Sequence, residues 1–300
     1  MNLRTLDLNL LKAFDALIDE RSVTRAAERL SLTQPAVSGI LNRLRDSFGD
    51  PLFVRVQRGI APTPRALELA APIKQVLAEI QQILTPQVFD PASADFTLSV
   101  AATDYALRAV VVPFVTALRP LAPGIRVAVL QLEESSVAER MERGQLDLAL
   151  LTPQSTAPEL HSRNLFEEHY ACILREDHPH ATADMDLDTF CSLEHAIVSL
   201  RGGGFHGATD QALAKLGRSR QVKVSVPSFV MLLDIIRTSD LMALVPSRLL
   251  EGTAGLVRLV PPLEVKGFTK TLVWHPRTHE DPGHRWVREL LAKSCAGIPF

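Results

Sequence analysis

The first 84 residues carry apolar positions at helical spacing. Between Asp7 and Glu20, apolar side chains recur every three or four positions, which predicts one amphipathic helix. Ser22 is expected to cap a second, short helix over residues 23–30, and Thr33 is expected to cap a third. A turn of three residues separates the second helix from the third. This arrangement predicts a helix-turn-helix unit.

After the third helix the pattern changes twice. Alternation over Phe53–Val56, followed by a glycine and prolines, predicts a small hairpin or wing. Thr63 and Pro64 then form a strong helix-start signal. Apolar residues follow in a 3-4-3-4-3 spacing at Ala66, Leu69, Ile73, Val76, Ile80 and Ile83. This seam predicts a coiled coil with a second copy, and the alternative is an ordinary helix lying on its own chain's core.

From residue 96 onward, strand-like and helix-like segments alternate. They lie at residues 96–104, 105–123, 125–134, 135–144 and 146–154. Such a βαβαβ succession predicts a parallel sheet. A second set begins at residue 167, and a closing strand and helix return to the first set. The fold class is therefore α/β, with two lobes and a cleft between them.

Charge is distributed unevenly along the chain. The formal net charge is -2, but residues 21–65 hold eight arginines against three acidic residues, a net +5 that leaves about -7 elsewhere. A basic end on an acidic remainder indicates an anionic partner such as nucleic acid.

Composition excludes several other classes of protein. Hydrophobic residues make up 46% of the chain, as in soluble globular proteins, and no run approaches the ~18 to 20 apolar residues of a membrane span. Three widely spaced cysteines fit neither a disulfide framework nor a zinc site, so we expect a cytoplasmic protein. The histidines lack cysteine or carboxylate at ligand spacing, and we expect neither a metal nor a cofactor.

The third helix presents one polar face. At 100° per residue, its candidate DNA-contacting residues fall within a ~80° sector opposite the apolar side. They are Gln34, Ser38, Asn42 and Arg45. Amide, hydroxyl and guanidinium groups pair with base edges and phosphates. Such a face on an isolated helix is usually only a solvated surface, but within a basic helix-turn-helix it predicts DNA reading.

Polar residues also follow the predicted strands of the α/β region. In parallel α/β units, ligands bind beyond the carboxyl ends of the strands. The candidate ligand-binding residues are Thr103, Asp104, Glu133, Ser135, Ser136, Thr152, Gly203, Gly204, Phe205 and Ser228. The glycines belong to the loop Arg201–His206, which lacks the Gly-Lys-Ser/Thr of a phosphate-binding loop.

The stretch AAERLSLTQPAVSGILNRLRDSFGDPLFVR, followed by the Thr-Pro pair of a long helix, resembles LysR-type transcriptional regulators. LRDSFGDPLFVR and the closing WHPRTHEDPGHRWVREL resemble the subgroup of nodulation regulators and aromatic-acid-responsive activators. The resemblance implies two lobes like those of periplasmic binding proteins, with an effector in the cleft. It also implies that the third helix, including Thr33 and Pro35, enters the major groove. The remaining DNA contacts, to the backbone, would come from Thr24, Arg25, Arg55 and Arg58.

The expected domains follow from these patterns. They are a winged helix-turn-helix domain over residues 1–63, a linker and dimerisation helix over 64–90, and an effector-binding domain over 91–300, with lobe I at about 91–166 and 272–300 and lobe II at about 167–271.

The expected function is a DNA-binding transcriptional regulator controlled by a small-molecule effector. Its expected partners are a near-palindromic double-stranded promoter site, an aromatic or carboxylic effector, a second or further copies in a homodimer or homotetramer, and RNA polymerase as a candidate. One alternative is a constitutive DNA binder without effector. Another is a small-molecule-binding protein or enzyme with an appended helix-turn-helix. An enzyme is not expected, because no nucleophile elbow occurs.

Overall fold

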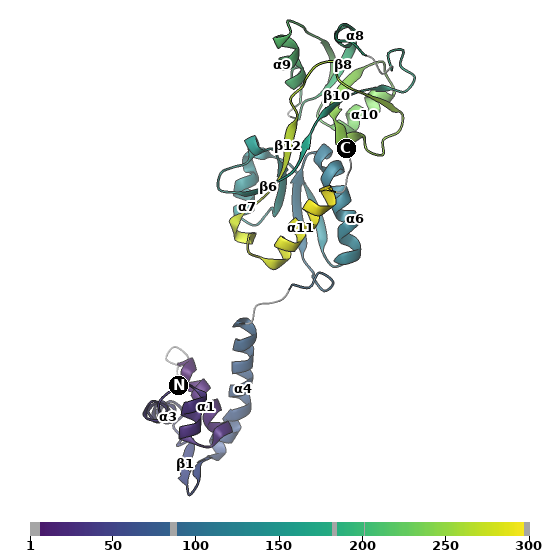
Figure 1. Cartoon of the computed structure of the whole chain (residues 1–300). Helices are drawn as coiled ribbons and strands as arrows, with labels where there is room; N and C mark the ends of the chain where they lie inside the picture. Colours follow the sequence, from purple (N-terminus) through teal and green to yellow (C-terminus); the bar gives the residue numbers. More distant parts are fainter. Residues whose placement is uncertain (1–6, 85–88, 182–184, 201, 297–300) are drawn as a thin grey trace. The chain divides into compact units, whose positions relative to one another are not determined.

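The structure is a computed structural model that describes residues 7–84, 89–181, 185–200 and 202–296. Residues 1–6, residues 85–88 near the end of the predicted linker helix, and Arg201 of the glycine loop lie outside these ranges. The chain divides into two compact units, residues 1–87 and 88–300 (Figure 1).

Unit 1 contains the predicted helix-turn-helix and hairpin. Its elements are α1 (Leu8–Glu20), α2 (Val23–Arg29), α3 (Gln34–Phe48), β1 (Phe53–Val56), β2 (Gly59–Pro62) and α4 (Pro64–Leu84). The predicted caps are confirmed, since the Ser22 hydroxyl accepts from the Arg25 N–H at 3.4 Å and that of Thr33 from the Ala36 N–H at 3.4 Å. These bonds satisfy N–H groups that lack an intrahelical partner.

The core of unit 1 joins the three helices to the hairpin. Its central side chains have no exposed surface and come from the three helices and the segment that leads into the hairpin: Phe14, Leu17, Ala26, Val37, Leu44 and Leu52. The Phe14 and Phe53 rings lie 5.7 Å apart between centroids. On α3, Leu41 is buried whereas Ile40 is half-buried.

Gly59 allows the hairpin to dock on the end of α1. The Ile60 N–H donates to the Arg21 carbonyl at 3.0 Å. Gly59 has φ +107°, and a Cβ there would lie 2.4 Å from the same carbonyl oxygen. Only glycine combines that backbone conformation with so close an approach. The hairpin is thus held in a fixed position on the helical part of unit 1.

The long helix α4 has two different halves. Ala66 and Ile73 are buried in the core of unit 1, and Leu69 and Leu77 are packed against it. Further along, Val76 is 42% exposed and Ile83 82% exposed. The first half therefore lies on its own chain's core, which is the arrangement given above as the alternative to a coiled coil. The second half leaves apolar side chains uncovered.

Unit 2 contains two five-stranded sheets (Figure 1). Sheet one has the order β4-β3-β5-β12-β6, from β3 (Thr97–Ala102), β4 (Arg126–Gln131), β5 (Leu148–Leu151), β6 (His161–Glu168) and β12 (Phe268–Trp274). Sheet two has the order β11-β7-β10-β8-β9, from β7 (Tyr170–Arg175), β8 (Glu194–Val198), β9 (Gln221–Val226), β10 (Met242–Pro246) and β11 (Leu256–Leu259). The predicted parallel βαβαβ unit is confirmed, because β3 pairs in parallel with both β4 and β5.

Helices surround the two sheets. They are α5 (Asp104–Ala106), the π-helical turn η2 (Leu107–Val111), α6 (Val112–Leu121), α7 (Val137–Glu142), α8 (Leu187–Ser192), α9 (Ala208–Lys215), α10 (Phe229–Arg237) and α11 (Pro282–Ala296). Short 3-10 turns lie at η3 (Glu134–Ser136), η4 (Pro153–Ser155), η5 (Ser247–Leu250) and η6 (Pro276–Thr278).

Two connections cross between the lobes. The chain leaves sheet one at the end of β6, enters sheet two with β7, and returns with β12 to pair between β5 and β6. The sequence patterns did not reveal β6, because polar residues dominate its first half and it lies at a sheet edge. In the described part of the chain, no helix has both the length and the apolar character needed to cross a membrane.

Candidate functional site

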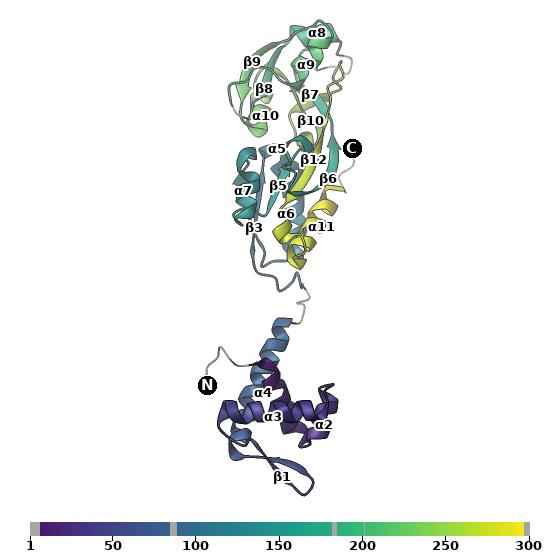
Figure 2. The ribbon, with the colours of Figure 1, turned by 90° about the vertical axis from the view of Figure 1, so that its left-hand side faces the viewer.

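The polar face of α3 is open to solvent. Gln34, Ser38 and Asn42 are exposed along the helix, and the hairpin β1–β2 projects from the same unit (Figure 2). The other predicted contacts on α2 and at the start of α3 are exposed as well: Thr24, Arg25, Thr33 and Pro35. The face is therefore available to a large partner.

Arg45 makes hydrogen bonds within unit 1 that the sequence did not reveal. Its guanidinium donates to the Pro51 carbonyl at 3.0 Å, to the Phe53 carbonyl at 3.0 Å and to the Asn42 side-chain oxygen at 3.2 Å. These bonds hold the segment that leads into β1 against α3. A contact of Arg45 with DNA stays a prediction, and it would have to coexist with this arrangement.

The local excess of positive charge is concentrated on fewer arginines than the count suggested. Arg25, Arg29 and Arg43 form ion pairs with Glu20, Asp19 and Asp7, which lie outside the counted window. Over residues 7–65 the balance is nine basic against seven acidic residues, a net +2.

The hairpin keeps its positive charge uncompensated. Arg55 on β1 and Arg58 in the turn are exposed, and neither has a hydrogen bond or ion pair within the described part of the chain. Exposed guanidinium groups without a carboxylate partner are suited to phosphate. The hairpin thus offers two free guanidinium groups to a partner.

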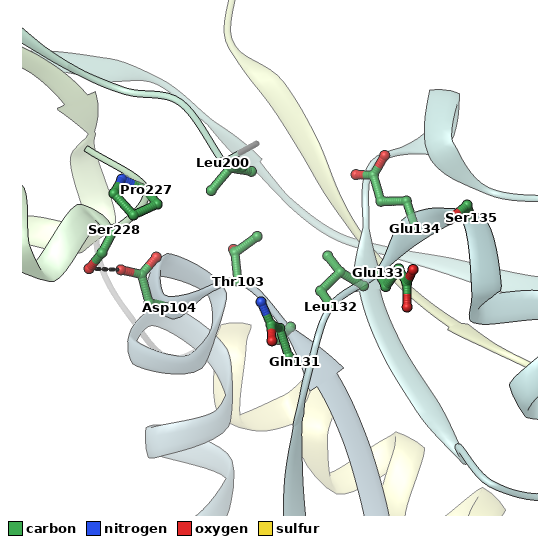
Figure 3. A pocket seen from close by; sticks show the side chains of 11 residues that line it. Thr103, Asp104, Gln131, Leu132, Glu133, Glu134, Ser135, Leu200, Pro227 and Ser228 are labelled. Carbon is green, nitrogen blue, oxygen red and sulfur yellow. Dashed lines mark hydrogen bonds between the residues drawn. The ribbon is translucent and has the colours of Figure 1, made fainter. Parts of the chain in front are cut away.

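In unit 2 a cavity of about 720 Å³ lies at the carboxyl ends of β3 and β4 (Figure 3). Five of the predicted ligand-binding residues line it: Thr103, Asp104, Glu133, Ser135 and Ser228. The wall is completed by Ala102, Gln131, Leu132, Glu134, Leu200 and Pro227. Most of these six directly adjoin the predicted positions, so the same strand-end rule would have found them had it been applied to whole turns.

The other predicted ligand-binding residues are not among the described residues of the cavity wall. The Ser136 hydroxyl donates to the Glu133 carbonyl at 3.2 Å, and that of Thr152 lies 3.5 Å from the Ser155 hydroxyl. Gly204 receives a hydrogen bond from Ser225 at 2.7 Å within a fixed turn. Gly203 and Phe205 are exposed. An effector contact at these five positions stays a prediction.

Asp104 joins the two lobes beside the cavity. One of its oxygens accepts from the Ser228 hydroxyl at 2.7 Å (Figure 3). The same oxygen accepts from the Val230 N–H at 3.1 Å. Ser228 in turn accepts from the Met231 N–H at 3.1 Å and caps α10. A carboxylate at a helix N-terminus is stabilised by the helix dipole. A lobe I side chain therefore supplies the anion at the start of a lobe II helix.

Glu168 makes a second, buried connection at the crossover. Its carboxylate accepts from the Tyr105 hydroxyl, from the Ser247 hydroxyl at 2.7 Å and from the Ser247 N–H at 3.0 Å. Tyr105 belongs to lobe I and Ser247 to lobe II. Burial, and then the neighbouring Glu168 charge, raise the pKa of Tyr105 far above its ordinary value, so the phenol remains a donor.

The cavity wall is acidic. Asp104, Glu133 and Glu134 line it, and the described wall residues include no basic side chain. The described residues hold no group of three or more His, Cys, Asp or Glu that could bind a metal ion. His284 instead bonds to Asp281 at 2.8 Å within lobe I. The cavity is therefore organised as a binding pocket with hydrogen-bonding groups at its rim.

Comparisons with known proteins decide the family. Residues 8–67 match the bacterial regulatory helix-turn-helix proteins of the lysR family, and residues 93–296 match the LysR substrate binding domain. The chain belongs to the LysR family. LysR-type proteins are DNA-binding transcriptional regulators with an effector-binding domain, so unit 1 is the DNA-binding part and unit 2 contains the effector-binding part.

Individual members of the LysR family match along the whole chain. The HTH-type transcriptional activator NagR of Ralstonia sp is 39% identical to this chain, and the match covers 98% of each of the two proteins. Nodulation protein D 3 of Rhizobium leguminosarum bv. phaseoli is 32% identical, with both chains fully covered. The crystal structure of the probable transcriptional regulator PA0477 from Pseudomonas aeruginosa is 31% identical, with a TM-score of 0.59, and covers 96% of this chain and 97% of its own. The resemblance to LysR-type and nodulation regulators is confirmed.

Proposed function

We propose that this LysR-type regulator binds a near-palindromic promoter site as a homo-oligomer, reading bases with α3 and gripping phosphates with the hairpin. The observation that carries the proposal is the exposed row of Gln34, Ser38 and Asn42 on a unit whose hairpin arginines have no partner among the described residues. Amide and hydroxyl groups read base edges, while guanidinium groups fix the position on the backbone.

Self-association is proposed to use the second half of α4. Val76 and Ile83 are exposed there at a seven-residue spacing, which places them on one helix face. Contact with a second copy would remove that apolar surface from water. A homotetramer would need a further interface in addition to this one.

The proposed output is activation of transcription, with RNA polymerase as a candidate partner. NagR carries the name of an activator and matches this chain from end to end. Because the partner is DNA, we place the protein in the cytoplasm, and we propose no enzymatic activity for the cavity.

The proposed effector binds in the cavity between the lobes and changes the DNA-bound state. Its wall contains residues of lobe I, such as Thr103 and Glu133, and of lobe II, such as Ser228. A ligand that contacts both lobes favours the arrangement in which its contacts are best, and this differential affinity shifts the equilibrium. An aromatic or carboxylic compound is the proposed class.

The test is a footprint on the protein's own promoter region, repeated with small organic acids, aromatic compounds and their neutral analogues. A protected site that changes with one compound supports the proposal. No protected site would remove DNA binding, whereas a site that responds to no compound would favour the constitutive alternative. Binding of a compound without any footprint would favour the small-molecule-binding alternative.

Two substitutions should separate base reading from phosphate binding. Gln34→Ala should weaken the preferred site by about 1–3 kcal/mol relative to random DNA, because one base contact is lost. Arg58→Ala should instead weaken both kinds of DNA and lower the salt dependence by roughly 0.9 log units per log unit of salt. Fluorescence anisotropy at several salt concentrations measures both effects. Equal binding by wild type and Gln34→Ala on both DNAs would contradict the assignment of this face.

Gly39 is the open position on the DNA-reading helix. A Cβ there would meet nothing within 4 Å, so Gly39→Ala should stabilise unit 1 by up to about 1 kcal/mol through helix propensity. If the missing side chain lets the backbone approach DNA, Gly39→Ala and Gly39→Asn should both weaken site binding. Unchanged affinity in both variants would leave Gly39 without a docking role.

A further inference from the structure

Lys270 lies on β12 at the edge of sheet one that carries the carboxyl ends of β3, β4 and β5, although it is not among the described residues of the cavity wall. β12 pairs antiparallel with β5, and Thr271 is opposite Leu151, the last residue of that strand. Lys270 therefore adjoins the carboxyl end of β5. The neighbouring strands β3 and β4 end at the same sheet edge, and their last residues, Ala102 and Gln131, line the cavity.

The environment of Lys270 is apolar and aromatic. The residue is 5% exposed, and its ammonium nitrogen lies 5.6 Å from the centre of the Tyr105 ring and 5.4 Å from that of Phe268. Burial lowers the pKa of Lys270 to about 8, against the opposing influence of Glu134 and Glu168. Glu134 belongs to the cavity wall.

The three N–H groups of the Lys270 ammonium have no hydrogen-bond acceptor within the described part of the chain, and no carboxylate there lies within 4.0 Å. In that part no fully buried side-chain nitrogen or oxygen lacks a partner. The ammonium must therefore reach accessible space. A nearly buried charge with open donors is poised for an acceptor that enters from outside.

Packing of β12 alone does not explain why position 270 is a lysine. Phe268, Lys270 and Leu272 alternate toward one face of β12, and the flanking two pack against the apolar core. An apolar residue would satisfy that position. Glu168, whose charge Lys270 could balance, already accepts hydrogen bonds from Tyr105 and Ser247.

We propose that Lys270 is a specificity-determining residue that binds the acidic group of the effector, a small organic acid lodged between the lobes. The inference rests on the proposed function, and it names a buried cation whose charge interacts with Glu134 of the acidic cavity wall. The carboxylate would accept from the ammonium, while the aromatic rings of Tyr105 and Phe268 flank the ion pair. The acidic wall would face hydroxyl or other donor groups of the same ligand.

The first test measures stability without ligand. Both tryptophans, Trp274 and Trp286, lie in unit 2, so tryptophan fluorescence of the full chain reports its unfolding in urea. Lys270→Met should raise the urea midpoint, because it replaces a charge that lacks an acceptor with an apolar side chain. Lys266→Met, at an exposed position just before β12, should leave the midpoint unchanged. A lowered midpoint for Lys270→Met would overturn the proposal in favour of a structural partner for Glu168.

The second test measures binding by calorimetry with benzoate, phenylacetate and cyclohexanecarboxylate, each beside its amide. At least one acid should bind the wild type at least tenfold more tightly than its amide. Lys270→Met should bind that acid roughly 10- to 100-fold more weakly and the amide equally well, whereas Lys270→Arg should retain part of the preference.

Equal binding of the acid by wild type and Lys270→Met, or no binding of any acid, would overturn the role of Lys270. The promoter footprint distinguishes this failure from that of the proposed function. A neutral compound that alters the footprints of wild type and Lys270→Met alike removes only the inference. If no compound of either class alters the footprint, the effector-responsive function fails as well.

Discussion

Replacing Glu168 with alanine is expected to destabilise unit 2 by about 3–5 kcal/mol. The carboxylate is 1% exposed and accepts from the Tyr105 hydroxyl and from two donors of Ser247. Alanine would leave these buried donors without an acceptor, each at a cost of about 1–3 kcal/mol before relaxation. It would also remove the negative charge near Lys270.

Urea unfolding followed by tryptophan fluorescence measures this loss, since both tryptophans lie in unit 2. Glu167→Ala is the matched control, because the neighbouring carboxylate is exposed and accepts only from the Thr269 hydroxyl at 2.8 Å. The control should change stability by less than about 0.5 kcal/mol. Similar losses for the two variants would contradict the role of Glu168 as the buried connection between the lobes.

The double substitution Val76→Asp with Ile83→Asp is expected to abolish self-association through α4 and to lower affinity for a near-palindromic site about 100-fold or more. Linked half-site binding commonly exceeds single-site affinity by roughly 10²- to 10⁴-fold, and a monomer loses that advantage. Both side chains are exposed and lie outside the core of unit 1, so the fold should persist.

Sedimentation velocity and anisotropy with full-site and half-site DNA measure the two effects together. Gln82→Asp adds a charge at an exposed polar position of the same helix and serves as the control. Binding to an isolated half-site should be unchanged in the double variant. An oligomer that survives the double substitution would show that the apolar second half of α4 is not the interface.

The DNA-binding unit was largely predictable from sequence. Ser22, Thr33 and Thr63 cap helices as expected, and the buried positions of α1 follow the helical period. These features depend on residues within a few positions of each other, where spacing and capping are decided locally. The hydrogen bonds of Arg45 were not predictable in this way, because its carbonyl partners lie beyond the end of α3.

The cavity was predictable only in part. The strand-end rule found Thr103, Asp104 and Glu133 because β3 and β4 are adjacent parallel strands whose ends are marked locally. Thr152 and Gly203 are not among the described wall residues, since the path of a loop beyond a strand end depends on its neighbours, and their contact with an effector stays a prediction. Glu168 gave no sequence signal, because the hydroxyl groups of Tyr105 and Ser247 that donate to it lie more than 60 residues away in either direction.

The sequence by itself determined the LysR-type architecture, the polar face of α3 and the row of strand ends that carries the cavity, because period, caps and strand termini are local properties. Only the tertiary structure decided which charges are committed and which are free. The register of β12 against β5 places Lys270 beside the carboxyl end of β5 across more than 100 residues of sequence. Long-range pairing fixes such neighbours, and no local pattern encodes them.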